Sequence, residues 1–202
     1  MPKIKQLLFD RKIFTLAAAS LLSFSCCLIS FSQEEGKAVE EAGPAGLTNS
    51  VGMKLVPVKA GDFLMGSKNE FGRWAHEHQH KVRISQPYYI GAYEVTQGEY
   101  QKVMGANPSY FSPGGAGKEK IKELDAGRLP VDSVSWAEAV EFCRKLSEVP
   151  AEKEAGRVYS LPTEAQWEYA CRAGQPGPYS GTGVLDDMGW QFHNTGGSHH
   201  PV

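Results

Sequence analysis

The residues of this chain best suited to covalent chemistry are its four cysteines. Cys143 lies in the stretch EFCRKL and Cys171 in YACRAG, whereas the other two lie near the N-terminus. A cysteine nucleophile needs partial exposure and a nearby cation that lowers its pKa. Here an arginine directly follows each of the two cysteines, and on a helix it points about 100° away. The sequence therefore favours structural cysteines over catalytic ones, either packed in a core or joined in a disulfide.

Other polar clusters offer little further chemistry. His76, His78 and His80 alternate, so on a strand their imidazoles would face one side and could together bind zinc or copper. Nothing nearby in the sequence supplies another ligand, which favours an exposed polar strand edge. The adjacent acids Asp186 and Asp187 are typical of a solvated turn. The stretch GGAGKEK lacks the first glycine and the Ser or Thr of a phosphate-binding loop, so we predict no catalytic, cofactor-binding or metal-binding residue in this chain.

Three helices are predicted by the same signal at their N-termini, and two of them carry the cysteines. A capping box places Ser or Thr at the N-cap and Glu or Gln three residues later, so that each side chain accepts a hydrogen bond from the other residue's backbone N–H. Gly105 and Gly174 can end the first and third helices. The boxes pair Thr96 with Glu99, Ser135 with Glu138, and Thr163 with Gln166.

Apolar residues at helical spacing predict which face of two of these helices is buried. In the second helix the stripe comprises Trp136, Ala139, Val140, Cys143 and Leu146. In the third helix it comprises Trp167, Ala170 and Cys171. Short strands are predicted over residues 55–58 and 63–65, in HKVRIS and in YYIGAYEV. The long stretch between the first two helices is rich in Gly, Pro and charge, which predicts a functional loop or a tolerated insertion.

The composition excludes one broad class of partner. With 21 basic and 23 acidic residues the formal net charge is −2, which leaves no electrostatic footprint for nucleic acid. Hydrophobic residues make up 41% of the chain, and it contains 22 glycines and 12 prolines. This mixture predicts a loop-rich domain with a modest core rather than a helical bundle.

The N-terminus has the layout of a secretory signal peptide, which we predict to span residues 1–32. Basic residues come first, Ile13–Phe31 carries no charge, and Ser30 and Ser32 supply small residues before a cleavage site at Gln33. An uncleaved membrane anchor is the alternative, since these 19 uncharged residues could just span a bilayer. Either way the protein is expected to be exported to the periplasm or the extracellular space, where disulfides form. Residues 33–50 are predicted to be a flexible linker and residues 51–202 the folded domain.

Six stretches of the mature chain resemble, in order, the motifs of the formylglycine-generating enzyme (sulfatase-modifying factor) family. They are GMKLVPVKAGDFLMGS, EHQHKV, YIGAYEVTQGEYQKVMGANPSYF, LPVDSVSWAEAVEFCRKLS, LPTEAQWEYACRAG and NTGGSHHPV. Each stretch alone is weak evidence, but together they are specific and cover nearly all of residues 51–202. Glu77 and His80 match the family pattern, His78 replaces its usual proline, and His200 matches in the last stretch.

The resemblance implies an irregular α+β fold that is related to C-type lectin-like domains and low in regular secondary structure. Enzymes of the family are oxidoreductases that convert a sulfatase cysteine to formylglycine, with molecular oxygen and a copper(I) ion held by two cysteines. Thiolates suit a soft cuprous ion, and a two-thiolate site leaves positions open for substrate. Copper and calcium are therefore expected for full-length members. A sulfatase or other protein substrate is the expected partner, with no membrane contact beyond the signal segment.

The family's copper-binding cysteines and most of its calcium ligands lie in a second half with no counterpart in this sequence, which ends inside the family's HPVG element. The resemblance therefore implies an incomplete domain and predicts no cofactor and no catalysis for this chain alone. The alternative is a non-catalytic, C-type-lectin-like binding or accessory module of an extracytoplasmic protein. Asn194 lies beside a region where some members ligate calcium, but no ligand role is carried over to it.

The resemblance also gives the two mature cysteines a structural meaning. Cys143 and Cys171 stand where some members carry structural cysteines whose partners lie in the second half. They are therefore candidates for a disulfide with each other, provided that their helices approach closely enough. Two unpaired thiols are the alternative.

Overall fold

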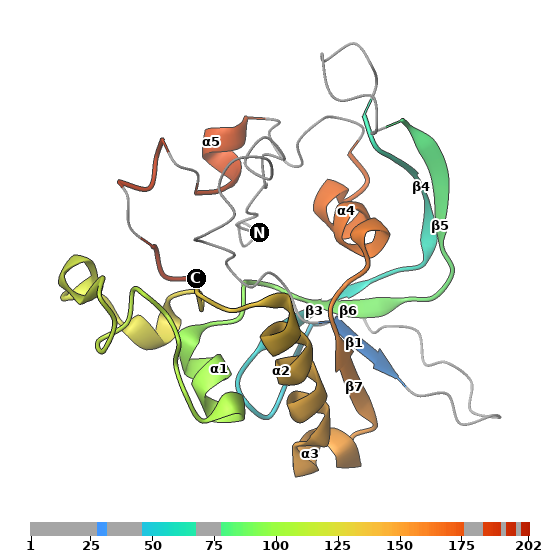
Figure 1. The fold of residues 1–202 in the computed structure, drawn as a ribbon. Coiled ribbons are helices and arrows are strands. Elements are labelled where there is room, and N and C mark those ends of the chain that lie inside the picture. Colours follow the sequence, from blue (N-terminus) through green and yellow to red (C-terminus); the bar gives the residue numbers. More distant parts are fainter. Residues whose placement is uncertain (1–27, 32–45, 68–77, 176–183, 191–192, 197–198) are drawn as a thin grey trace.

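The computed structural model describes residues 28–31, 46–67, 78–175, 184–190, 193–196 and 199–202. Two antiparallel β-sheets form its framework, and helices pack against them (Figure 1). The larger sheet has the strand order β2-β3-β6-β1-β7, and the smaller sheet pairs β4 with β5. This mixture of helices and strands is the α+β class that the sequence predicts. The strands span Leu28–Phe31 (β1), Leu47–Thr48 (β2), Lys54–Val58 (β3), Gly61–Met65 (β4), His80–Ile84 (β5), Tyr88–Gly91 (β6) and Arg157–Ser160 (β7).

The predicted strands form, but two neighbours in sequence separate into different sheets. Only Lys59 and Ala60 join β3 to β4, yet β3 pairs with β6 and β4 pairs with β5. The β4–β5 pair therefore forms a separate ribbon, and α4 packs against it. On the other side of β3 lies β2, which falls within the stretch 33–50 that the sequence predicts to be a linker.

All three predicted helices begin at the predicted N-caps, with α1 spanning Gln97–Met104, α2 Trp136–Glu148 and α4 Glu164–Arg172. Each capping box is complete. In α1 the Glu99 N–H donates to Thr96 Oγ1 at 3.2 Å, and the Thr96 N–H donates to Glu99 Oε2 at 2.8 Å. Shorter helices that the sequence did not predict are α3 (Pro150–Glu154), α5 (Leu185–Met188) and 3₁₀ turns at Lys118–Ile121 and Ala126–Arg128. None of the helices in the described ranges is long and apolar enough to cross a membrane.

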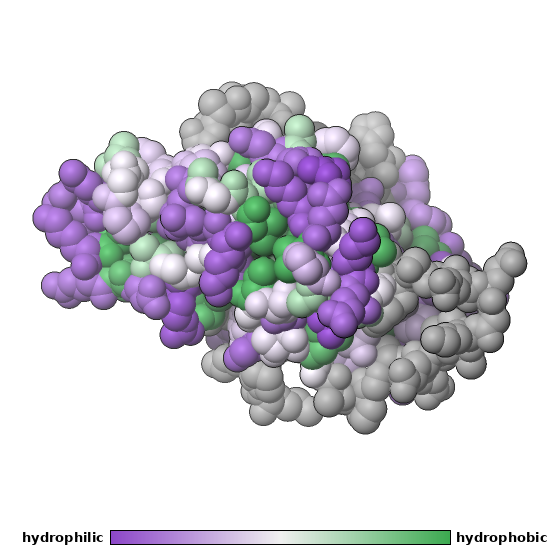
Figure 2. Space-filling model, turned by 90° about the horizontal axis from the view of Figure 1, so that it is seen from below, coloured by the Kyte–Doolittle hydropathy of each residue, from purple (hydrophilic) through white to green (hydrophobic). Residues whose placement is uncertain are grey.

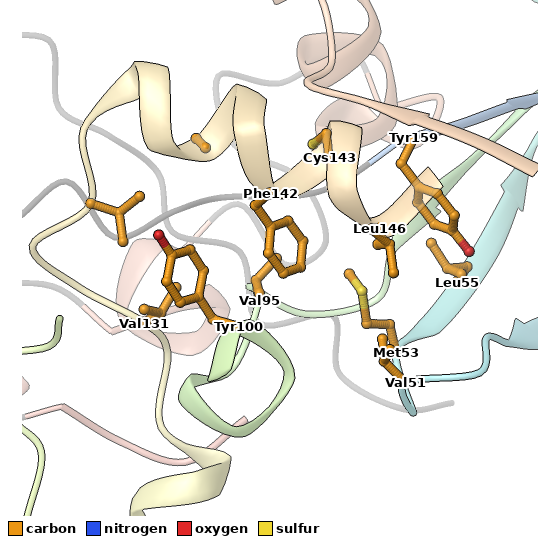
Figure 3. Packing of buried hydrophobic residues seen from close by; sticks show 12 residues of the cluster. Val51, Met53, Leu55, Val95, Tyr100, Val131, Phe142, Cys143, Leu146 and Tyr159 are labelled. Carbon is orange, nitrogen blue, oxygen red and sulfur yellow. The ribbon is translucent and has the colours of Figure 1, made fainter. Parts of the chain in front are cut away.

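The main hydrophobic core lies where α1 and α2 face the larger sheet (Figure 3). Phe142 and Leu146 of α2 are fully buried there, together with Leu55 of β3. The Phe142 ring stacks on Tyr100 of α1, with ring centroids 5.4 Å apart. Because Tyr159 of β7 belongs to the same cluster as Leu55 of β3, this core connects both helices to two separate strands of the larger sheet.

The buried face of α2 differs from the predicted stripe. Ala139, Phe142, Cys143 and Leu146 are buried, whereas Trp136 is 73% exposed and Val140 is 39% exposed. The prediction was wrong for these two residues because, viewed down the helix axis, the centre of the buried face points between residues 142 and 143. Phe142 stacks on Tyr100 at this face. Val140 then lies roughly 110° from that centre, and Trp136 lies at its border in the first turn. Hydrophobic residues do remain at the surface, and one face shows them as a strip between hydrophilic side chains (Figure 2).

Helix α4 covers the smaller sheet and carries Cys171. The helix is joined to the end of β4 because Glu168 Oε1 accepts a hydrogen bond from the Gly66 N–H, and Arg172 Nη2 donates to the Gly66 carbonyl, both at 2.8 Å. Cys171 is 5% exposed, as its predicted apolar face requires. The helix ends at Ala173, which adopts a left-handed φ of 46° one residue before the predicted Gly174.

Candidate functional site

Asp132 is the point where three of the six quoted stretches meet. It lies in LPVDSVSW, just before α2, and its side chain has no exposed surface. Its Oδ1 accepts a hydrogen bond from the Tyr110 N–H at 2.7 Å, and its Oδ2 accepts one from the Phe111 N–H at 3.3 Å. The Ser133 hydroxyl donates to Oδ1 at 2.7 Å. The carboxylate therefore holds the backbone of the loop that follows α1 in a fixed position.

Further buried polar side chains hold the same loop from α1. Gln97, the first residue of α1, is 1% exposed, and its Nε2 donates to the Phe111 carbonyl at 2.8 Å. Its Oε1 accepts from Asn107 Nδ2 at 2.9 Å. Ser109 Oγ in turn accepts from the Asp132 N–H at 3.1 Å. These groups form one connected network, which is stabilising only when every member is satisfied.

The last described residues of the chain pack on this network. His199 Nδ1 lies 3.6 Å from Asp132 Oδ2, and the imidazole ring lies 4.6 Å from the Phe111 ring. Burial lowers the pKa of His199, the nearby His200 lowers it further, and the charge of Asp132 opposes them without reversing the shift. His199 is therefore a neutral imidazole at neutral pH. Val202 fixes the segment further, because its N–H donates to the Arg128 carbonyl at 3.1 Å.

This arrangement can position a surface, but its buried carboxylate is not available as a reacting group. Both oxygens of Asp132 accept hydrogen bonds from donors of this chain, and no part of the side chain reaches solvent. A general base must come within hydrogen-bond reach of a substrate proton, and Asp132 has no such access. What the network presents to solvent is the ordered loop, on which Tyr110 is 46% exposed.

The two mature cysteines lie on different helices. Cys143 is 3% exposed on α2, which packs against β7 of the larger sheet. Cys171 is 5% exposed on α4, which packs against β4 and β5. Both are buried, as their apolar helix faces predict. A disulfide between them stays a prediction.

Of the other polar groups singled out in the sequence, His78, His80, Asp186 and Asp187 are exposed, and Asn194 is half-buried. His80 Nδ1 contacts the His78 carbonyl at 2.9 Å on an exposed strand end, and His76 and Glu77 lie outside the described residues. Asp186 and Asp187 lie in α5, and after this helix Asn194 Nδ2 donates to the Gly189 carbonyl at 3.1 Å. Within the described ranges, no group of three or more His, Cys, Asp or Glu residues could hold a metal ion.

Sequence reasoning missed Asp132, Gln97 and Ser109, although one signal was present. Asp132 stands between Val131 and Val134, both buried, in a stretch that precedes a capping box. A carboxylate flanked by core residues must find buried donors. Which donors it finds depends on a loop more than 20 residues earlier, and no local pattern names them.

The loop offers a matched pair of substitutions. A Cβ on Gly115 would lie 2.2 Å from the Tyr110 carbonyl oxygen and 2.6 Å from that of Ser109, whereas a Cβ on Gly114 would meet nothing within 4 Å. We expect Gly115→Ala to displace the loop from Asp132 and to destabilise the domain by about 1–3 kcal/mol. Gly114→Ala is the control and should leave urea unfolding unchanged. Equal midpoints for the two variants would show that the loop is not held against Asp132.

Comparison with known proteins places these stretches in one family. Residues 43–202 match the model of the sulfatase-modifying factor enzyme 1-like domain. A protein named chaperone protein LppX from Paenibacillus barcinonensis is 33% identical over 140 residues, which cover 54% of this chain and 45% of that protein. The formylglycine-generating enzyme of Mus musculus is 27% identical over 177 residues, covering 66% of this chain and 45% of the enzyme.

A solved structure agrees with these matches. The structure of PvdO from Pseudomonas aeruginosa superposes with a TM-score of 0.53 at 26% identity, covering 70% of this chain and 55% of PvdO. The chain thus spans about half the length of the proteins it matches.

Proposed function

This chain belongs to the family of sulfatase-modifying factor enzyme 1-like domains, and from that membership we propose that residues 43–202 act as the non-catalytic scaffold half of such a domain. The observation that carries the proposal is the buried Asp132 network, whose polar groups hydrogen-bond to the backbone and side chains of one loop and hold it in place. We place the protein outside the cytoplasm on the strength of its predicted leader. Its partner in this proposal is a sulfatase or another protein. The names of two relatives, a chaperone protein and a formylglycine-generating enzyme, support a protein as the partner.

The chain's own cysteines do not fit a copper(I) centre. Such a centre needs two thiolates that converge on one ion and leave a position open for substrate. Cys143 lies on α2 and Cys171 on α4, and each side chain is at least 95% buried, so neither sulfur has a position open to substrate. We therefore derive no catalytic step through copper on these residues.

Oxidation of a sulfatase cysteine to formylglycine is the second candidate function. Its support is the 27% identity to the formylglycine-generating enzymes of Mus musculus and Bos taurus. In this alternative the matched half supplies the framework, and the copper-binding thiolates come from outside the residues described here. Both candidates agree that Cys143 and Cys171 have a structural role.

A thiol and activity assay tests this proposal on the full chain. Because both side chains are buried, we expect neither Cys143 nor Cys171 to react with a water-soluble thiol reagent in the native state. Peptide mapping after labelling in denaturant without reductant then separates two thiols, which label, from a disulfide, which does not. With copper(I), oxygen, a thiol reductant that supplies the two further electrons for reduction of O2 to water, and a cysteine-containing sulfatase peptide, we expect no formylglycine by mass spectrometry, while the Mus musculus enzyme converts the same peptide.

Two results would overturn the scaffold assignment. One is rapid labelling of either cysteine in the native protein. The other is conversion of the peptide that disappears in both Cys143→Ser and Cys171→Ser. Conversion that survives both substitutions would instead support the second candidate, with thiolates supplied elsewhere.

A further inference from the structure

The last described segment, residues 199–202, folds back on the loop between α1 and α2 (Figure 1). The Val202 N–H donates to the Arg128 carbonyl at 3.1 Å, and Arg128 Nη2 donates to the Val202 carbonyl at 2.5 Å. The His200 ring stacks on Trp190, with ring centroids 3.7 Å apart. These contacts dock the segment and bring its first side chain against the buried network.

His199 lies between an aromatic ring and a buried carboxylate. Its ring centroid is 4.6 Å from that of Phe111, and its Nδ1 is 3.6 Å from Asp132 Oδ2. The distance between Nδ1 and Oδ2 is too long for a hydrogen bond. Only 18% of the His199 side chain is exposed. An imidazole in this place has therefore lost most of the water that would solvate a charge.

The charged groups around His199 come from several elements. Asp132 carries a negative charge, but three donors of this chain already bond to its carboxylate. The positive or protonatable groups are Lys120, whose Nζ lies 5.8 Å from the centroid of the Phe111 ring, Arg128, which holds Val202, and the adjacent His200. One shared negative charge thus faces two cations and a second imidazole.

The docked segment therefore opposes protonation of His199. Burial is the largest effect and lowers the pKa of His199 below its ordinary value of 6.5, Asp132 raises it, and His200 lowers it. Because a solvated imidazole accepts a proton more readily than the docked one, the imidazole stabilises the docked state above about pH 6.5. This stabilisation is lost as pH falls through the lowered native pKa.

The network beneath His199 does not need the segment. The bonds that Asp132 makes to Tyr110, Phe111 and Ser109 use no atom of residues 199–202. Phe111 is 7% exposed while the His199 ring lies against it. Release of the segment would thus leave the loop in place and expose an apolar ring beside a carboxylate oxygen.

We propose that His199 is an acid-sensitive latch, whose protonation in mildly acidic solution undocks residues 199–202 and uncovers Phe111 on a loop that stays folded. The segment docks again when the proton leaves. The latch consists of side chains of this chain alone. It is therefore independent of whether the matched domain acts as a scaffold or as part of an enzyme.

NMR spectroscopy of the full chain at several pH values tests the latch. The through-space contact between protons of the His199 and Phe111 rings reports docking, and the chemical shift of the His199 Cε1 proton reports protonation. We expect the contact to be lost between about pH 7 and about pH 5, with the same midpoint as the chemical shift and below the midpoint of the exposed His80. The Tyr110 amide should stay protected from hydrogen exchange throughout.

Any of four results would overturn the proposal. The first is a ring contact that persists after His199 is protonated. The second is a His199 midpoint above that of His80, which would mean that Asp132 stabilises the charge in the docked state. The third is a His199 ring that does not titrate above about pH 5. The fourth is loss of Tyr110 protection over the same pH range, because the loop would then unfold with the segment.

Substitutions at residue 199 separate its titration from that of other groups. His199→Phe keeps a ring that can pack on Phe111 but cannot be protonated, so the ring contact should persist at about pH 5. His199→Gln, followed at the Val202 amide, repeats the test without an aromatic ring. His80→Gln removes an exposed histidine and is the matched control, which should keep the wild-type response. Release at the wild-type midpoint in both residue-199 variants would show that another group drives it and would overturn the latch.

Discussion

Replacing Phe142 with alanine is expected to lower the free energy of unfolding by about 3–5 kcal/mol. The ring has no exposed surface and stacks on Tyr100 with an interplanar angle of 6°, so truncation leaves a cavity between α1 and the sheet. The surrounding side chains come from several elements and cannot all relax into that cavity. Urea unfolding at 25 °C, followed by circular dichroism, measures the change.

Trp136→Ala on the same helix is the control for this prediction. Trp136 is a larger residue, but it is 73% exposed, so its removal should change stability by no more than about 0.5 kcal/mol. The contrast separates the observed buried face of α2 from the stripe predicted by spacing. A large loss in Trp136→Ala together with a small one in Phe142→Ala would place the wrong face of the helix in the core.

Replacing Glu152 with glutamine is expected to cost about 3–5 kcal/mol, because it removes the charge of a buried, fully paired carboxylate. Glu152 of α3 has no exposed surface. Its Oε1 accepts from the Ser50 N–H at 2.6 Å, and its Oε2 accepts from the Tyr159 hydroxyl and from Arg157 Nη1 at 3.0 Å. A glutamine would direct its NH₂ group at one set of these donors. Urea unfolding at pH 7 measures the loss.

The same carboxylate predicts a pH dependence of stability. Burial alone raises the pKa of Glu152, but hydrogen bonds from Ser50, Tyr159 and Arg157 outweigh it and lower the pKa to about 2 from 4.5. A depressed native pKa stabilises the fold above the unfolded value, and this stability is lost as pH falls from about 5 through 2. The shift corresponds to about 3 kcal/mol. Glu152→Gln should lack this component, so the two unfolding free energies should converge toward pH 2.

Glu148→Gln is the matched control for both measurements. Glu148 accepts a hydrogen bond from Arg144 at 2.6 Å on α2, but its side chain is 61% exposed. An exposed ion pair contributes little because solvent screens it. The variant should therefore match wild type at pH 7 and follow the same loss at low pH. A control as destabilised as Glu152→Gln would mean that charge removal, rather than the buried network, explains the effect.

The helix starts could be predicted from the sequence because a capping box is complete within four residues. Thr96, Ser135 and Thr163 each bond to a residue three positions later, and no distant contact is needed to form the motif. The strand at 80–84 followed from alternation in the same way. Burial of Cys143 and Cys171 followed from their neighbours on the helix.

The face of α2 and the location of the polar network could not be predicted locally. Spacing predicted that Trp136 and Val140 face inward, whereas the structure buries Phe142, whose ring stacks on Tyr100 about 40 residues away in the chain. Asp132 likewise gains its function from the N–H groups of Tyr110 and Phe111. These partners come together only after the loop between α1 and α2 folds back.

The sequence by itself determined where the three capped helices begin and where the strands β3, β4, β5 and β6 lie, and six ordered stretches indicated the family. Caps and alternation are short-range properties of the chain, and the order of the six stretches can be compared with a family without any structure. The tertiary structure alone decided which strands are neighbours and which polar groups become buried together. It inserted Leu28–Phe31 between β6 and β7, two strands separated by more than 60 residues. Pairing of this kind depends on strands far apart in the sequence, which no local pattern identifies. The leader over residues 1–32 stays a prediction.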